Sequence, residues 1–349
     1  MKKTETEKVQ LIGAIGSPYT RKMVSLLRYR AIPYKITWGQ PEVILPAMGL
    51  ELPKPLLLPT FLFPDESGGM KAVTDSTPII RRLEAMSPER SVLPGDPALA
   101  FIDYLLEDFG DEWVTKYMFH YRWHFETDAD NAGTLLPLSY GVNLPSDMLK
   151  QVKTMATERQ VSRLYVVGSN DTTAPIIDAS FRRFLQAMEA HLEAQPYLLG
   201  SRPGAGDFAL FGQLTQLVGV EPTSRAIAHE LSPRTVMWTS VMEDLNGLEP
   251  KDSDWNNPDE MPDTLRGILT EVGRTYVPAQ LANAKAVQAG EKTWEAQIDG
   301  ALWTQPSFPY QAKCLQWVNE QYQALSADDR SRVDRILAGT GCEALLFAE

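Results

Sequence analysis

Hydroxyl and carboxyl residues stand at two places where a short apolar run gives way to the start of a helix. Ser17 follows the run at 9–15, and Asp75 and Ser76 follow a second short run, with a proline close behind in each case. Serine is a preferred helix cap, and proline is a preferred first helical residue. The free N–H groups of a helix start attract an anion, and a hydroxyl directed at a thiol favours its thiolate. Both places therefore predict either plain helix caps or a site for a small anionic ligand.

Patterns for metal binding or dithiol chemistry are weak. His120 and His124 lie four residues apart on one side of a predicted helix, but no third ligand accompanies them, so we predict no metal site. Cys314 and Cys342 show neither zinc nor redox spacing. Two cysteines in a chain of 349 residues suit free thiols in a reducing compartment.

The charge balance restricts the partners. The chain carries 33 Lys and Arg against 45 Asp and Glu, a net charge of −12, which argues against a nucleic-acid backbone as the main partner. The N-terminus is charged and lacks the apolar stretch of a signal peptide, and no apolar run approaches the roughly 18 residues that span a membrane. We therefore expect a cytoplasmic protein whose partner is a small molecule, with no nucleic acid and no membrane involved.

The elements around the two hydroxyl sites predict a small α/β domain. The first part is a βαβ unit, which implies parallel strands joined by a right-handed crossover. The predicted order is a strand at 9–15, a helix from 18, a strand at 34–38, an irregular stretch at 39–57, strands at 58–63 and 70–74, and a helix that starts within 75–78.

From residue 98 the pattern changes to long helical segments, the first of them rich in aromatic residues. Residues 127–150 show little periodicity and are predicted to be a loop-like insertion, and 250–263 form an acidic, proline-rich linker. A β-hairpin is predicted at 294–303, because Asp299 and Gly300 separate two alternating runs. The predicted helices lie at 98–126, 151–163, 174–195, 207–220, 233–248, 264–289 and 309–337.

The order of these motifs resembles the cytosolic glutathione S-transferase superfamily. Ser17-Pro18-Tyr19-x-Arg21-Lys22 after the first strand, Leu58-Pro59 before the third, and Asp75-Ser76 at the later helix resemble its thioredoxin-like domain. Tyr197-Leu198-Leu199-Gly200 and Asp207-Phe208-Ala209 resemble its helical domain, and the whole chain is similar to a group of long bacterial transferase-like proteins.

This resemblance implies a fold in three parts. They are a thioredoxin-like α/β domain over 1–90 that binds glutathione, an all-α C-terminal domain over 98–250 with an insertion near 127–170, and a C-terminal extension over 264–349 packed on the helical domain. The superfamily usually forms dimers, so we expect a homodimer.

The resemblance also assigns roles in the first domain. Ser17 takes the catalytic position, with Tyr19 as a second hydroxyl candidate. Leu58 precedes the expected cis-proline, Pro59, and turns its backbone toward the peptide-like ligand; only X–Pro bonds adopt cis cheaply. Asp75 and Ser76 then match the pair that holds the γ-glutamyl end of glutathione, although Ser17, Pro59, Asp75 and Ser76 also have ordinary structural interpretations.

In the second domain the resemblance predicts an acceptor pocket beside the aromatic helix. Tyr117, His120, Tyr121 and His124 are the residues expected to face a substrate, and the alternative is that this helix is buried among aromatics. Asp207 is expected to be structural. The usual hydroxyl residue three positions earlier is Gly204 here, so we expect the helix start to survive without the reciprocal hydroxyl bond.

These observations predict a glutathione-dependent transferase that conjugates the glutathione thiolate, as co-substrate, to an electrophilic small molecule. One alternative is a non-catalytic binding or interaction protein on the same fold. Another is a glutathione-dependent isomerase, lyase or peroxidase. Disulfide exchange is not expected, because Ser17 and Thr20 occupy the positions of a redox dithiol.

Overall fold

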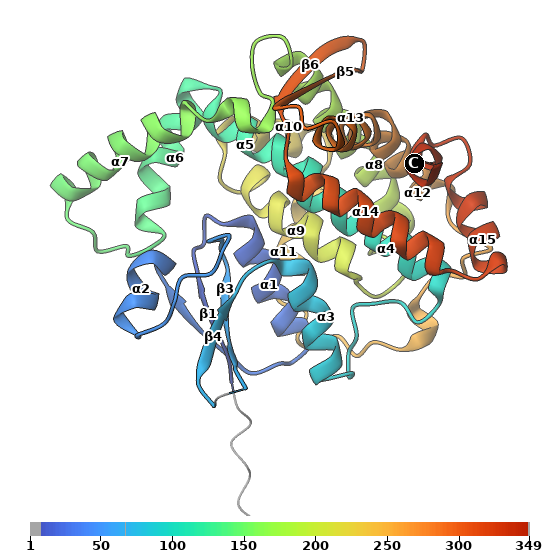
Figure 1. The fold of residues 1–349 in the computed structure, drawn as a ribbon, viewed down its shortest axis with the longest axis horizontal. Helices are drawn as coiled ribbons and strands as arrows, with labels where there is room; N and C mark the ends of the chain where they lie inside the picture. Colours follow the sequence, from blue (N-terminus) through green and yellow to red (C-terminus); the bar gives the residue numbers. More distant parts are fainter. Residues whose placement is uncertain (1–7, 67, 348–349) are drawn as a thin grey trace, which may run out of the picture.

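A computed structural model describes residues 8–66 and 68–347 of the chain. In Figure 1 a small sheet with its helices lies at the bottom of the view, below and beside a larger array of helices. The thioredoxin-like domain and the helical domain expected from the sequence are both present.

The sheet is mixed, and its βαβ unit has the parallel strand pair that the sequence predicted. Its strand order is β2-β1-β3-β4, with β1 parallel to β2 and antiparallel to β3, and β3 antiparallel to β4. Leu11 in the centre pairs with Ile36 on one side and Phe61 on the other. The strands are β1 (Val9–Gly13), β2 (Tyr34–Trp38), β3 (Thr60–Pro64) and β4 (Met70–Val73).

Three helices accompany this sheet, and one of them corrects the sequence analysis. α1 (Pro18–Tyr29) and α3 (Ser76–Met86) start where their caps predicted. The stretch predicted to be irregular contains α2 (Pro41–Ala47), with a proline at each end. Proline is tolerated in the first turn of a helix, where Pro41 lies. Because α2 is so short, its second proline, Pro46, falls in the last turn, and the prolines that indicated an irregular stretch are compatible with a helix.

The helical domain follows the prediction in outline, with helices that are shorter and more numerous. The predicted helix at 98–126 is interrupted by a π-helical turn (Gly110–Val114), and π turns are frequent at functional sites. The helices are α4 (Pro97–Phe109), α5 (Thr115–Trp123), α8 (Ala174–Ala194), α9 (Ala205–Leu217), α10 (Pro222–Leu231) and α11 (Pro233–Met242).

The N-terminus of α9 has the structural role predicted for it. The carboxylate of Asp207 accepts hydrogen bonds from the backbone N–H groups of Gly204, at 2.9 Å, and Leu198, at 3.0 Å. The backbone half of the capping box is therefore kept, and the hydroxyl half is absent because glycine has no side chain.

The insertion is helical, which corrects the loop predicted at 127–150. It contains α6 (Glu126–Leu138) and α7 (Ser146–Val161). No residue of α7 is fully buried. A helix without a buried face has little apolar periodicity, so the sequence analysis placed the start of this helix too late, at 151, although the helix predicted at 151–163 covers most of α7.

The C-terminal extension packs onto the helical domain and contains the predicted hairpin. A short π turn (Val272–Tyr276) divides its first helix, and Ser326 caps its last one. Figure 1 shows α14 running along α4. The elements are α12 (Asp263–Glu271), α13 (Val277–Gln288), β5 (Thr293–Ile298), β6 (Ala301–Pro306), α14 (Pro309–Ala324) and α15 (Ala327–Leu337).

One hydrophobic core extends from Val9 in the sheet to Leu345 at the end of the extension. Within the described chain, no helix is both long enough and apolar enough to cross a membrane.

The contact between α1 and α9 joins the two domains and depends on a glycine. A Cβ added at Gly212 would lie 2.4 Å from the carbonyl oxygen of Pro18 and 3.0 Å from Cβ of Lys22. Only glycine lets the backbones of these helices approach so closely.

Replacing Gly212 with Ala should therefore lower the free energy of unfolding by about 1–3 kcal/mol, because the helices must move apart. Urea denaturation measures this change. Gly95→Ala is the matched control, since an added Cβ there meets nothing within 4 Å. An unchanged stability in Gly212→Ala would show that this helix contact is not tight.

Candidate functional site

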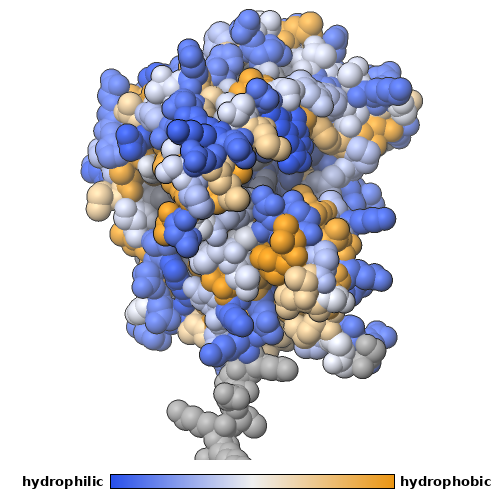
Figure 2. All heavy atoms as spheres, turned by 90° about the vertical axis from the view of Figure 1, so that its left-hand side faces the viewer, coloured by the Kyte–Doolittle hydropathy of each residue, from blue (hydrophilic) through white to orange (hydrophobic). Residues whose placement is uncertain are grey.

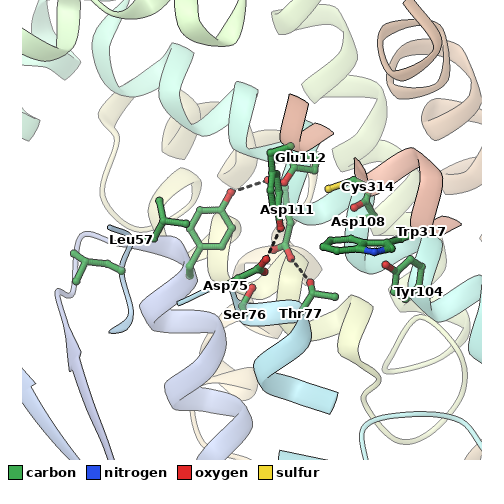
Figure 3. A pocket seen from close by; sticks show the side chains of 13 residues that line it. Leu57, Asp75, Ser76, Thr77, Tyr104, Asp108, Asp111, Glu112, Cys314 and Trp317 are labelled. Carbon is green, nitrogen blue, oxygen red and sulfur yellow. Dashed lines mark hydrogen bonds between the residues drawn. The ribbon is translucent and has the colours of Figure 1, made fainter. Parts of the chain in front are cut away.

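A cavity of about 230 Å³ lies where the first domain, α4 and the extension meet. In Figure 3, Leu57 stands at one end, Asp75, Ser76 and Thr77 along one side, and Tyr104, Cys314 and Trp317 at the other end. The lining residues are Tyr19, Leu57, Leu58, Asp75, Ser76, Thr77, Tyr104, Asp108, Asp111, Glu112, Tyr310, Cys314 and Trp317.

The Leu57–Leu58 end of the cavity is set by the entry into β3. The Leu58–Pro59 peptide bond is cis, as predicted. Both leucines line the cavity, and Pro59 itself does not. The backbone before the proline is thus placed beside the start of α3.

Asp75 and Ser76 form the second side of the cavity. Asp75 has a φ of 84°, a conformation that non-glycine residues rarely adopt and that is concentrated at functional sites. Its Oδ2 accepts a hydrogen bond of 2.9 Å from the hydroxyl of Tyr310 on α14. Burial raises the pKa of the Asp75 carboxyl, and that hydrogen bond opposes the rise. The extension therefore reaches into the predicted ligand site.

Ser17 and Tyr19 have different positions relative to the cavity. Ser17 caps α1, with its Oγ accepting a hydrogen bond of 3.2 Å from the N–H of Thr20, and it is not among the residues that line the cavity. Tyr19 does line it, and its hydroxyl donates to the carbonyl of Asp111 at 2.7 Å. Burial, Glu112 and Asp111 raise the pKa of Tyr19 well above its usual value, so the phenol keeps its proton.

The acceptor pocket predicted on α5 is not found there. Tyr117, His120 and Tyr121 are buried in the aromatic core, and neither they nor His124 line the cavity. The two tyrosine hydroxyls are engaged there: that of Tyr117 is 2.6 Å from Ser180 Oγ, and that of Tyr121 donates to Asp178 at 2.6 Å. The alternative of a helix buried among aromatics is the correct one, because α5 lies between α8, α9 and the insertion.

The rings of His120 and His124 stack on each other, and no third metal ligand joins them among the described residues. Their ring centroids are 4.5 Å apart, and His120 Nδ1 is 2.8 Å from Ser169 Oγ. Burial and the neighbouring His124 lower the pKa of His120 to about 3, so His120 is neutral. In the part of the chain that the structure describes, no three His, Cys, Asp or Glu side chains are arranged to hold a metal ion.

Several residues of the cavity were not predicted from the sequence. Asp108, Asp111 and Glu112 come from the end of α4 and its π turn, and Tyr310, Cys314 and Trp317 come from α14. One signal was available: carboxyl groups recur within an otherwise aromatic and apolar segment, FGDEW. Buried acidic residues are rare unless they are paired or functional.

Burial keeps these carboxyl groups partly protonated near neutral pH. It raises the pKa of Asp108 to about 7, of Asp111 to about 6 and of Glu112 to about 8, and neighbouring carboxyl groups add to the rise. Each loss of a proton would place a negative charge in a poorly solvated site.

Lys22 is the buried cation that holds this region together. Its Nζ lies 2.9 Å from Glu107 Oε1, 2.6 Å from Asp111 Oδ2 and 3.1 Å from Ser76 Oγ. Although burial opposes it, Arg81 and Lys22 together lower the pKa of Glu107 to about 2. One ammonium group thus connects α1, the start of α3 and α4.

Replacing Lys22 with Met should lower the free energy of unfolding by about 3–5 kcal/mol, because buried carboxylates lose their shared cation. The loss should be larger at pH 8 than at pH 5, since Asp111, with its raised pKa, can take up a proton at the lower pH. Urea denaturation at both pH values tests this. Lys150→Met on the exposed side of α7 is the control, and equal losses at the two pH values would refute the role given to Asp111.

Comparison with known proteins finds solved structures and family models to which parts of the chain are similar. No curated protein matches it. Among solved structures, a glutathione transferase family member from Pseudomonas fluorescens pf-5 with two glutathione bound is 17% identical, with a TM-score of 0.41 over 68% of this chain and 89% of that one. A glutathione S-transferase from Rhodospirillum rubrum F11 is 18% identical, with a TM-score of 0.42 over 67% and 87%.

A third solved structure, a glutathione transferase from Burkholderia graminis with two glutathione molecules bound per subunit, is 15% identical, with a TM-score of 0.43 over 76% and 90%. The sequence itself matches two family models in succession. The glutathione S-transferase N-terminal domain matches residues 11–91, and the glutathione S-transferase C-terminal domain matches residues 157–241. In this order on one chain, residues 11–91 and 157–241 are therefore recognised as the two domains found in glutathione S-transferases.

Proposed function

We propose that the protein binds glutathione in the cavity between the start of β3 and the start of α3, and conjugates its thiolate to an electrophilic small molecule. The observation that supports this most is that Leu58, Asp75 and Ser76, which the sequence resemblance assigned to glutathione, line one cavity together.

The Asp75–Ser76 corner suits the γ-glutamyl end of the tripeptide. The carboxylate of Asp75 would pair with the α-ammonium group, where it now accepts the hydroxyl of Tyr310. The N-terminus of α3 and the hydroxyl of Ser76 would receive the α-carboxylate. Lys22 lies 3.1 Å from Ser76 Oγ, and its charge would favour an anion there.

In this proposal Ser17 stabilises the sulfur. A free thiol ionises near pKa ~8.5, so a neutral solution holds little thiolate. The N-terminus of α1 carries a partial positive charge, and the hydroxyl that caps it still has its own proton to donate. The thiol would lose its proton to solvent, and the thiolate sulfur would then form a bond to the electrophilic carbon as the leaving group departs.

A non-catalytic binding protein is the second candidate, and two observations favour it. Ser17 does not line the cavity, and a Cβ added at Gly16 would lie 2.3 Å from Leu136, so α6 of the insertion covers the turn before Ser17. The carboxyl groups of Asp111 and Glu112 would also oppose a nearby thiolate.

A cytoplasmic homodimer remains part of this proposal. α14 and α15 pack on α4, so a second copy would have to meet the protein on other surfaces. Light scattering of the purified protein measures the assembly.

Replacing Ser17 with Ala should reduce conjugation of glutathione to 1-chloro-2,4-dinitrobenzene by about 10- to 100-fold, the worth of one hydrogen bond to a charged group. Glutathione binding, measured by calorimetry, should be retained.

Two further variants separate catalysis from capping. Ser17→Asp keeps an acceptor for the helix start but has no hydroxyl, so it should be as stable as the parent and inactive. Ser17→Thr keeps both functions and should remain active. Full conjugation activity in Ser17→Ala would remove Ser17 from the mechanism, and a parent protein without conjugation but with glutathione binding would support the non-catalytic candidate.

A further inference from the structure

The middle and far end of the cavity hold more carboxyl groups than the described residues pair with cations. Asp75, Asp108, Asp111 and Glu112 all line it. Among the described residues, the only cation in an ion pair with any of the four is Lys22, which bonds to Asp111 and is shared with Glu107. Three of the four carboxyl groups therefore have no cationic partner in that part of the chain.

Asp111 also offers an unused hydrogen-bond acceptor. The residue is 6% exposed and lines the cavity, and its Oδ1 is buried without a hydrogen-bond partner among the described atoms. A buried carboxylate oxygen without a donor costs free energy, so an occupant that supplies a donor would be favoured.

Aromatic side chains enclose the acidic groups. Tyr104 and Trp317 form the far end (Figure 3). Tyr310 also lines the cavity, and its hydroxyl is bonded to Asp75. Aromatic rings attract cations through their faces and also bury hydrocarbon. The combination of carboxyl groups and rings is the chemistry that recognises an organic ammonium ion, whereas the described carboxyl groups are not arranged to hold a metal ion.

We propose that this cavity binds a small organic cation, with an ammonium group among Asp108, Asp111 and Glu112 and a hydrocarbon body against Tyr104 and Trp317. The proposal of a cation site does not depend on the transferase function. A second step, in which the electrophile conjugated by this protein carries an amine, rests on the proposed transferase function.

The surroundings of Glu112 determine how binding should depend on pH. The amide of Gln311 donates a hydrogen bond of 2.9 Å to the Glu112 carboxyl. The titratable groups that interact electrostatically with Glu112 are Asp108, Asp111, Lys116, Tyr19, Tyr310 and Cys314. Because the pKa of Glu112 is raised to about 8 and that of Asp108 to about 7, both groups gain negative charge between pH 6 and pH 8.5. An aliphatic ammonium ion stays charged throughout this range.

The test is a calorimetric titration of the full-length protein with putrescine (1,4-diaminobutane), beside butane-1,4-diol, its uncharged counterpart in shape. We expect putrescine to bind, the diol not to bind, and affinity to rise from pH 6 to pH 8.5. At pH 7.5, repeating the titration in buffers of different ionisation enthalpy should detect protons released from the carboxyl groups.

Glu112→Gln should weaken putrescine binding at least tenfold, because the variant loses about one charge-assisted hydrogen bond to the ammonium group. Asp108→Asn is the second variant, so that a folding failure of either one, checked by circular dichroism, leaves the other as the test. Glu291→Gln, which changes an exposed residue outside the cavity, should bind putrescine as the parent does. Equal binding of the diol, affinity that falls as pH rises, or unchanged affinity in both cavity variants would overturn the proposal.

A parallel titration with glutathione keeps the two proposals apart. Putrescine binding without glutathione binding would sustain the cation site and reject the transferase function. Glutathione binding without putrescine binding would reject the cation site and leave the glutathione site standing, with the conjugation assay deciding between transferase and binding protein.

Discussion

A single buried ammonium group, that of Lys22, organises the junction on which the rest of the structure depends. It lies in α1, yet its bonds reach Ser76 at the start of α3 and Glu107 and Asp111 on α4 and its π turn. A charge buried this deeply is tolerated only when its partners are fixed around it. Lys22 therefore couples the packing of the two domains to the shape of the cavity between them.

The same junction accounts for the unusual character of the cavity. The first domain contributes the features expected of a glutathione site, and the second domain adds Asp108 and Glu112. The extension then encloses the carboxyl groups with α14 and bonds Tyr310 to Asp75. A thiolate and these acids would repel each other, so in our proposals the glutathione sulfur lies near Ser17 and the organic cation lies near Glu112.

Sequence reasoning was reliable where local signals determine local structure. The cap at Ser17, the helix start at Asp75–Ser76, the Leu58–Pro59 entry into β3 and the Asp299–Gly300 turn were all predicted from neighbouring residues. It missed α6 and the start of α7, whereas the helix predicted at 151–163 covers most of α7. It also missed the cavity-lining role of Trp317 and of the acidic residues of α4 and its π turn. Trp317 and Asp108 are more than 200 positions apart and meet in the cavity only after folding. The acceptor site on α5 was wrong for a related reason: an aromatic helix has the same pattern whether its rings pack in a core or line a pocket.

The most direct test of the central claim is a crystal structure of the protein with glutathione. We predict the γ-glutamyl carboxylate at the backbone N–H and hydroxyl of Ser76, the α-ammonium group at Asp75 in place of the Tyr310 hydroxyl, and the sulfur within about 3.5 Å of Ser17 Oγ. Glutathione bound elsewhere, or with its sulfur among Asp108, Asp111 and Glu112, would contradict the account.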